Sequence, residues 1–388
     1  MHFSGVLFVM SKRLFLPLSL PALMLLGATW LLAEQHAKNV ILFLGDAGGL
    51  STLSAASIHG YQKPRALYLQ RMPHIALSET SSTSSWVTDS AAGMTAIVTG
   101  QKTDNGVLSQ MPPNAAAKTD GAELKTILEY AEQHGLSTGV ISNVAMADAT
   151  PAACYAHVNS RKSFGDIFAQ VWKPRYGDGV DLVIGNGRKK ILEALQELKI
   201  DPQKELAASG RGFYDSMAAI PADASRFVAL FDDDAFDVDA ATAKAIGILS
   251  RNPKGFFLMV EWDLHPGKPE RTLNTVVKLD HLIERTAKQM DKNSLVMFTA
   301  DHSFDFRLLR GKRSADILLP SAPNVVRKPD QPEEKSDVMI GTAHTGEEVL
   351  VAAQGPGSER VTGILANTDL FHIMLSAYGW NADKPDKP

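Results

Sequence analysis

The sequence has little cysteine and no large excess of charge of either sign. Its single cysteine, Cys154, excludes an intramolecular disulfide, so a fold of this length has to depend on its buried core. Cys154 lies in the apolar run Ala-Ala-Cys-Tyr, which predicts a core side chain rather than a nucleophile. The formal net charge of −4 gives no electrostatic reason to expect a nucleic-acid partner.

What the chain does have is a globular composition. Of its 388 residues, 45% are hydrophobic and 21% are charged, which excludes an intrinsically disordered protein. The length suits one large α/β domain or two, and no internal repeat or strong domain break is visible. We therefore expect a single domain over residues 34–388. A stretch rich in proline and charge at 321–336 predicts a surface loop or insert over residues 309–342.

The N-terminus has the pattern of a targeting segment. Lys12 and Arg13 precede a nearly unbroken apolar run over residues 14–33, as in a secretory signal. Cleavage after Ala33 would remove residues 1–33 and release the protein into the periplasm or the medium. The run is also long enough to span a membrane, so an uncleaved anchor over residues 14–33 is the alternative.

After this segment, apolar runs alternate with stretches of helical period. This alternation predicts a three-layer α/β sandwich with a large, mostly parallel central sheet flanked by helices. The predicted strands are residues 39–44, 138–142, 181–185, 255–260, 294–300 and 349–353. The predicted helices are residues 90–99, 122–134, 190–198, 272–290 and 368–378.

The stretch from Trp86 to Gly100 predicts a helix whose first turn contains Ser90, directly after Asp89. A serine at this position faces unpaired backbone N–H groups and the positive end of the helix dipole. Such a place suits a bound phosphate or a nucleophilic alkoxide. The alternative is that Asp89 or Ser90 only caps the helix, since both residue types are preferred there.

Acidic residues and histidines follow several of the predicted buried strands. Asp46 comes just after the strand at 39–44, and Asp301-His302 follows the strand at 294–300. In open α/β sheets ligands bind outside the carboxyl ends of the strands, so these side chains are placed for a common site.

The strand at 255–260 leads directly into Glu-Trp-Asp-Leu-His, where Glu261, Asp263 and His265 alternate. In extended chain, residues two apart share one face of the strand. Two carboxylates and an imidazole on one face make a poor core surface and a good metal-binding surface.

Several motifs in the order of the chain together resemble the alkaline phosphatase family. They are G-D-A-G, V-T-D-S-A-A, D-A-T-P-A-A, A-H-V-N-S-R, F-F-L-M-V-E, T-A-D-H and A-H-T-G-E-E. The resemblance runs from residue 39 to about residue 378, and seven ordered motifs are far more specific than any single one. It implies a phosphomonoesterase that binds two Zn²⁺ ions and one Mg²⁺ ion.

The resemblance implies the residues that act on the phosphate. Ser90 matches the nucleophile that becomes phosphoserine, and Asp89 matches the acid that orients an arginine. Arg161 matches that arginine, whose planar fork holds two phosphate oxygens.

The resemblance also implies the ligands of two zinc ions. Asp46 matches the carboxylate that bridges one zinc and the magnesium, and Ser90 matches a residue that reaches the same zinc in the free enzyme. The remaining matched zinc ligands are Asp301 and His302 for the first ion and Asp263, His265 and His344 for the second.

The magnesium site is implied by Thr150 and Glu261 as ligands and by Asp148 as a partner of the magnesium-bound waters. Some relatives carry histidine at the position of Asp148, and an aspartate favours magnesium because that ion prefers oxygen ligands. The family usually reads E-x4-D-x3-H where this chain reads E-x-D-x-H. This shortening leaves open which carboxylate serves which metal and whether the third site is complete.

The expected activity is hydrolysis of phosphate monoesters, with inorganic phosphate as product and inhibitor, and a homodimer is one expectation of the resemblance. A phosphodiesterase or sulfatase on the same scaffold is an alternative. Arg161 favours a monoester because it needs two unesterified oxygens, and the residues after Ser90 lack a sulfatase-like C/S-x-P-x-R context. A non-catalytic metal- or phosphate-binding relative is the other alternative.

Overall fold

The computed structural model describes residues 1–2, 36–113, 119–232, 236–309, 313, 316–318 and 337–383. From His36 on, the described residues form one compact unit. Residues 3–33 of the predicted signal or anchor lie outside the described residues, as does most of the predicted loop at 309–342. Within the part that is described, no helix combines the length and the apolar character needed to cross a bilayer.

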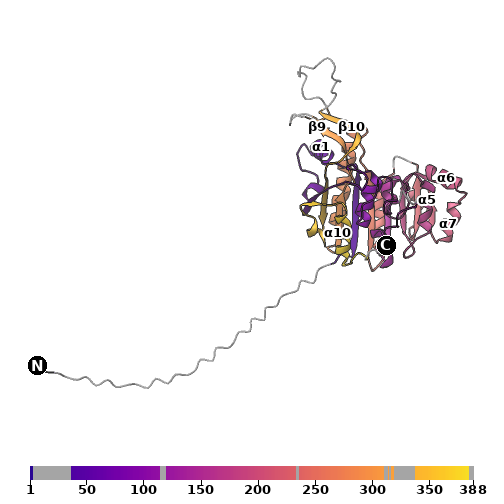
Figure 1. Cartoon of the computed structure of the whole chain (residues 1–388), viewed down its shortest axis with the longest axis horizontal. Coiled ribbons are helices and arrows are strands. Elements are labelled where there is room, and N and C mark those ends of the chain that lie inside the picture. Colours follow the sequence, from indigo (N-terminus) through magenta and orange to yellow (C-terminus); the bar gives the residue numbers. More distant parts are fainter. Residues whose placement is uncertain are drawn as a thin grey trace, which may run out of the picture. The chain divides into compact units, whose positions relative to one another are not determined.

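A ten-stranded sheet runs through the middle of this unit, counted over the described residues (Figure 1). In order across the sheet, its strands are β12 (Ile364–Leu365), β2 (His74–Ser78), β11 (Val349–Gln354), β8 (Ser294–Thr299), β1 (Asn39–Asp46), β7 (Phe256–Asp263), β3 (Ser137–Ala145), β4 (Leu182–Asn186), β6 (Phe227–Phe231) and β5 (Gly212–Tyr214). Only β11 runs antiparallel to its neighbours, β2 and β8, among these strands. The prediction of a mostly parallel central sheet is confirmed.

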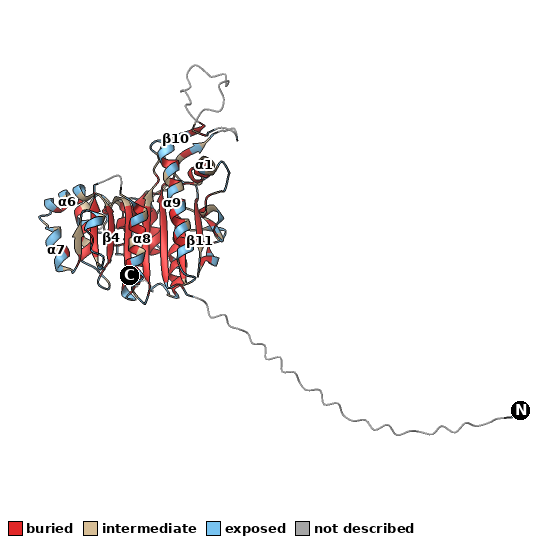
Figure 2. Cartoon of the chain, turned by 180° about the vertical axis from the view of Figure 1, so that it is seen from behind, coloured by how far each residue is buried: buried red, intermediate tan, exposed pale blue. Residues whose placement is uncertain are grey.

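Helices cover both faces of the sheet and bury two apolar layers. They are α1 (Leu50–Tyr61), α2 (Ser90–Thr99), α3 (Ile127–Gln133), α4 (Ala149–Ala152), α5 (Phe164–Ala169), α6 (Arg188–Glu197), α7 (Pro202–Ala208), α8 (Val238–Leu249), α9 (Pro269–Gln289) and α10 (Asp369–Tyr378). Helices α1, α8 and α9 pack in one apolar cluster, and α2, α3 and α10 pack in the other. Figure 2 shows α8 and α9 in front of the buried strands, with their outer faces exposed.

The strand order explains why distant parts of the sequence meet. Strands β8, β1, β7 and β3 are adjacent and parallel, so their carboxyl ends lie side by side at one edge. Asp46 is the last residue of β1 and pairs in register with Asp263, the last residue of β7. Asp301 follows two residues after β8 ends. Every residue of β1 is buried, as expected for a central strand covered on both faces.

Several predicted boundaries need correction. The helix predicted at 122–134 begins only at Ile127, because Thr126 and Glu129 form a capping box that fixes its first turn. Residues 338–342 of the predicted loop instead begin β10 (Val338–Thr345), which pairs with β9 (Ser303–Leu308) in a separate two-stranded sheet. Residues 201–245 gave little signal, yet they contain α7, β5, β6 and the start of α8.

Replacing Gly93 in α2 by alanine is expected to lower the free energy of unfolding by about 1–3 kcal/mol. A Cβ at this position would lie 2.8 Å from the backbone oxygen of Asp301, so the helix or the end of β8 has to move. The matched control is Gly247→Ala in α8, where a Cβ meets nothing within 4 Å and helix propensity predicts a small gain. Urea unfolding of both variants checks this, and equal stabilities for the two would contradict the close packing of α2.

Candidate functional site

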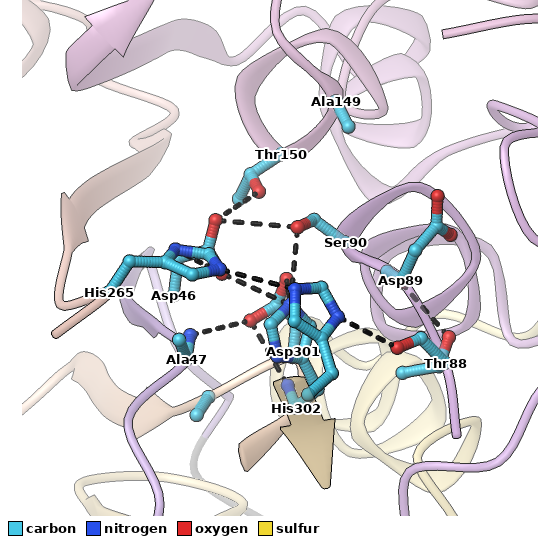
Figure 3. Close-up of polar contacts among 12 residues, drawn as sticks. Asp46, Ala47, Thr88, Asp89, Ser90, Ala149, Thr150, His265, Asp301 and His302 are labelled. Carbon is cyan, nitrogen blue, oxygen red and sulfur yellow. Dashed lines mark hydrogen bonds and ion pairs between the residues drawn. The ribbon is translucent and has the colours of Figure 1, made fainter. Parts of the chain in front are cut away.

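Ser90 is the first residue of α2 and its side chain is buried at the carboxyl edge of the sheet. Asp89 caps the helix, since its carboxylate accepts a hydrogen bond from the Ala92 backbone N–H at 3.1 Å. Ser90 Oγ lies 3.4 Å from Asp46 Oδ2 and 3.2 Å from His302 Nε2 (Figure 3). The predicted cap is therefore Asp89, while the Ser90 side chain points into a polar cluster rather than capping the helix.

Asp46, Asp301 and His302 form a first cluster around that hydroxyl. The His302 Nδ1–H donates to the Ser303 carbonyl oxygen at 3.1 Å, so Nε2 carries a lone pair. This lone pair faces Asp46 Oδ1 at 3.2 Å and Asp301 Oδ2 at 3.6 Å. Electron-rich atoms at such distances repel one another unless a proton or a metal cation lies between them. The donor set of two carboxylates, an imidazole and a hydroxyl suits zinc.

His265 and His344 form a second cluster next to the first. His344 comes from β10, and its Nδ1–H donates to the Thr88 carbonyl oxygen at 3.2 Å. His265 lies just past the end of β7, and its Nδ1 contacts Asp263 Oδ1 at 2.8 Å. The Nε2 atoms of the two rings face each other at 3.3 Å. The extended alternation predicted for this segment holds for Glu261 and Asp263 but ends before His265.

Glu261 and Thr150 line the same pocket as Asp46. Glu261 is fully buried and accepts a hydrogen bond from Ser142 Oγ at 2.5 Å. Thr150 Oγ1 lies 3.4 Å from Asp46 Oδ2. These oxygens suit a hard cation such as magnesium.

The charges of nearby histidines offset the burial of Asp46 and Asp301 only in part. Burial and the charge of Asp301 raise the pKa of Asp46 to about 7, and burial raises the pKa of Asp301 to about 6. Burial and the charge of Asp46 raise the pKa of Glu261 well above its usual range. Of the described residues, none donates a hydrogen bond to Asp46 Oδ1, Asp301 Oδ2 or Glu261 Oε1. Bound cations would remove this cost, so the residues present fit the metals that the sequence implies.

Arg161 lines the same pocket and is held by two carboxylates. Its guanidinium donates to Asp89 at 3.0 Å and to Asp148 at 2.9 Å. Although burial opposes the charged form, Asp148 and Asp89 raise the pKa of Arg161 above its usual range. Asp148, which the sequence assigned to the magnesium waters, thus contacts the arginine directly.

A pocket of about 160 Å³ opens between these groups. Its lining contains both Ser90 and Arg161, and its volume is of the order that a phosphate group with a few waters needs. The lining residues are Asp46, Ser90, Val144, Asp148, Thr150, Arg161, Glu261, Asp263, His265 and His344. Asp301 and His302 lie buried beneath it. All the residues predicted for the site are therefore brought together.

Some residues that support the site were not identified from the sequence. Ser142 pairs in register with Glu261 across β3 and β7, a neighbourhood that no local motif signals. Asn143 accepts the backbone N–H of Asp263 at 2.8 Å, and Phe304 packs edge-on against His265, with ring centroids 5.4 Å apart. The position of Asn143 at a strand tip was the one signal that could have identified it.

The protein has a mostly parallel α/β sheet, with carboxylates and histidines clustered at its carboxyl edge beside a serine at a helix N-terminus. This combination defines the class of an α/β metallohydrolase. The family model for alkaline phosphatases matches residues 37–215 and 233–319. The chain belongs to the alkaline phosphatase family. It is therefore a phosphomonoesterase.

Individual relatives agree with this assignment. The chain is 30% identical to the alkaline phosphatase of Escherichia coli (strain K12), over 90% of this chain and 87% of that protein. Among solved structures, the alkaline phosphatase of the Antarctic bacterium TAB5 superposes with a TM-score of 0.72 at 26% identity, covering 89% of this chain and 100% of that one. A TAB5 variant in which aspartate replaces a histidine, with Mg bound in its M3 site, matches with a TM-score of 0.70 at 26% identity, covering 90% of this chain and 100% of that one.

Proposed function

We propose that this protein hydrolyses phosphate monoesters by in-line attack of Ser90 on phosphorus, through a covalent phosphoserine. The observation that carries the proposal is the position of Ser90 Oγ, which lies 3.2 Å from His302 Nε2 and lines the same pocket as Arg161. The Ser90–phosphorus bond forms as the ester oxygen leaves as the alcohol. Water then breaks the phosphoserine and releases inorganic phosphate.

We infer that the site takes two zinc ions and one magnesium ion. The first zinc would be held by Asp46, Asp301 and His302 with Ser90, and the second by groups around His265 and His344. Magnesium would be held by Glu261, Thr150 and Asp46, and the Mg reported in the M3 site of the TAB5 variant supports this choice. When bound, these ions supply charge that lowers the pKa of a coordinated hydroxyl and stabilises negative oxygens.

The protein's own groups would orient the phosphate. Arg161 can direct two N–H groups at two non-bridging oxygens, and Asp89 and Asp148 keep the guanidinium in place before substrate arrives. The N-terminus of α2 adds the positive end of its dipole next to Ser90.

A comparison of substrates tests the proposed activity. Aryl phosphate is expected to exceed the matching phosphodiester and aryl sulfate in kcat/KM by roughly 10²-fold or more, because Arg161 needs two unesterified, charged oxygens. Steady-state kinetics with the three esters on the zinc- and magnesium-loaded enzyme measure this. A faster diester or sulfate reaction would overturn the monoesterase assignment.

Replacing Arg161 by alanine is expected to raise the inhibition constant of inorganic phosphate by about 10- to 100-fold, since charge-assisted hydrogen bonds are worth about 1.5–3 kcal/mol. The control is Arg307→Ala, an exposed arginine that pairs with Asp305 away from the pocket. An unchanged inhibition constant in the Arg161 variant would remove this residue from phosphate binding.

We propose that the protein is exported, by a signal over residues 1–33 that is cleaved after Ala33. The support is the positive flank and apolar run of the sequence. N-terminal sequencing of the protein from the periplasm or medium tests this, and an intact N-terminus in a membrane fraction would favour the anchor over residues 14–33.

We also propose that the protein acts without a nucleic-acid partner. A homodimer rests only on the family resemblance and is tested by sedimentation analysis.

A further inference from the structure

The most exposed tryptophan of the described residues lies close to Ser90 in the sequence. Trp86 has 89% of its surface exposed, whereas the other described tryptophans, Trp172, Trp262 and Trp380, are buried or half-buried. Tryptophan is a large side chain that proteins usually cover for the most part. One that is left uncovered offers a flat apolar face to a ligand, so its position relative to the pocket decides whether it has a role.

The chain that contains Trp86 leads out of the pocket. Ser90 and Thr88 are buried, and Trp86, two residues before Thr88, is exposed. Beside this chain, His344 lines the pocket and Gly346, two residues later, is exposed. The two chains touch at the pocket, where the Thr88 carbonyl oxygen lies 3.2 Å from His344 Nδ1. They touch again further out, where a Cβ on Gly346 would lie 3.2 Å from the Trp86 carbonyl oxygen. Because two residues of extended chain span at most about 7 Å, Trp86 lies at the rim of the pocket.

The backbone around Trp86 is held on both sides. The Ser85 carbonyl oxygen accepts the Ser82 N–H at 3.0 Å, and the Val87 N–H donates to Ser85 Oγ at 3.2 Å. Asn105 Nδ2 donates to the Val87 carbonyl oxygen at 3.1 Å. The indole ring itself is exposed, so a ligand can cover it without displacing other side chains. A surface that is fixed in advance loses little conformational freedom when it binds.

The pocket is too small to enclose a whole phosphate ester. Its volume is about 160 Å³, whereas pockets that enclose a small molecule measure about 300–1,000 Å³. Ser90 is buried, and in an in-line displacement the leaving oxygen lies opposite the attacking oxygen. The alcohol group of a bound monoester is therefore directed away from Ser90, out of the pocket and across its rim.

Trp86 is not part of a larger apolar patch. Met339, the exposed large apolar residue of β10, lies five positions from His344, roughly 15 Å along the strand. Ser85, just before Trp86, is polar, and Val87, just after it, is half-buried. An interface with another protein has a contiguous apolar centre, whereas a single exposed ring suits one flat group of a small molecule.

We propose that Trp86 binds the alcohol group of the substrate and makes the enzyme selective for monoesters of flat, apolar alcohols, such as aryl phosphates. An aromatic ring that crosses the rim packs against the indole face, whereas a small alkyl group does not reach it. The inference rests on the proposed function only in taking the pocket of Ser90 and Arg161 as the phosphate site.

Two phosphonates test the inference by binding alone, because their P–C bond is not hydrolysed. We expect phenylphosphonate to bind the metal-loaded Trp86→Ala variant about 3- to 10-fold more weakly than the unaltered protein, through loss of one stacked aromatic contact. Methylphosphonate has no ring, and its Kd should stay the same. Trp86→Phe should keep most of the phenylphosphonate affinity, and Leu198→Ala, an exposed apolar side chain at the end of α6, is the control. Isothermal titration calorimetry measures both ligands on all four proteins.

The alternative roles of Trp86 give different results. An equal loss of affinity for both phosphonates would show that Trp86 only supports the site, and an unchanged phenylphosphonate affinity would remove it from substrate binding; either result overturns the inference. A Trp86→Ala variant that keeps both affinities but sediments differently would assign the ring to a contact with a second copy of the chain, and this result overturns it too. A protein that binds the phosphonates as expected but hydrolyses no monoester would refute the proposed function alone.

Discussion

Replacing Ser90 by alanine is expected to lower kcat for aryl phosphate hydrolysis by about 10³-fold or more, because loss of a covalent nucleophile removes the reaction path itself. Within the protein the side chain contacts Asp46 and His302, and it lines the pocket where the substrate would bind. Steady-state turnover and zinc content are measured on the same preparation. This variant also separates an enzyme from a binding protein, because a binder would keep its function.

The matched control is Ser163→Ala, which makes the same chemical change just before α5, where the serine makes no capping hydrogen bond with its side chain. We expect its kcat to be unchanged. The Ser90 variant should still bind inorganic phosphate, since Arg161 and the other proposed metal ligands remain. Turnover close to that of the unaltered enzyme in the Ser90 variant would refute the phosphoserine route.

Removing the metals is expected to abolish activity and to destabilise the fold. Without cations, Asp46, Asp301 and Glu261 are left as buried carboxylates whose pKa values burial raises. By linkage, a metal present at 100 times its Kd adds about 2.7 kcal/mol to stability, so the chelated protein should unfold at a lower temperature. Dialysis against EDTA followed by an activity assay and thermal unfolding measures both effects.

Adding back Zn²⁺ with Mg²⁺ should restore activity and the unfolding temperature together, whereas Mg²⁺ alone should not restore activity, because nitrogen ligands such as His302 and His344 suit zinc. Full activity in excess chelator would contradict the metal assignment. Lost activity with an unchanged unfolding temperature would show that the ions act in catalysis but not in stability.

Much of the fold and the site could be predicted from the sequence because the signals were local. A strand buried on both faces reads as a continuous apolar run, as in β1, and Asp46 follows that run directly. The helix start at Ser90 was predicted by its Asp-Ser cap and its end by Gly100, and both are confirmed. No strand or helix was predicted for residues 201–245, because their strands are short and the order of these strands in the sheet is not sequential.

By itself, the sequence determined the family, the parallel sheet and the set of side chains at the strand tips, because apolar runs and ordered motifs are properties of neighbours along the chain. Only the tertiary structure decided which atoms face one another. Strand register places Ser142 beside Glu261, packing turns Asp148 towards Arg161, and the turn after β7 directs Asp263 to the Nδ1 of His265. These pairings depend on sheet register and side-chain torsions set by residues far away in sequence, so no local pattern encodes them.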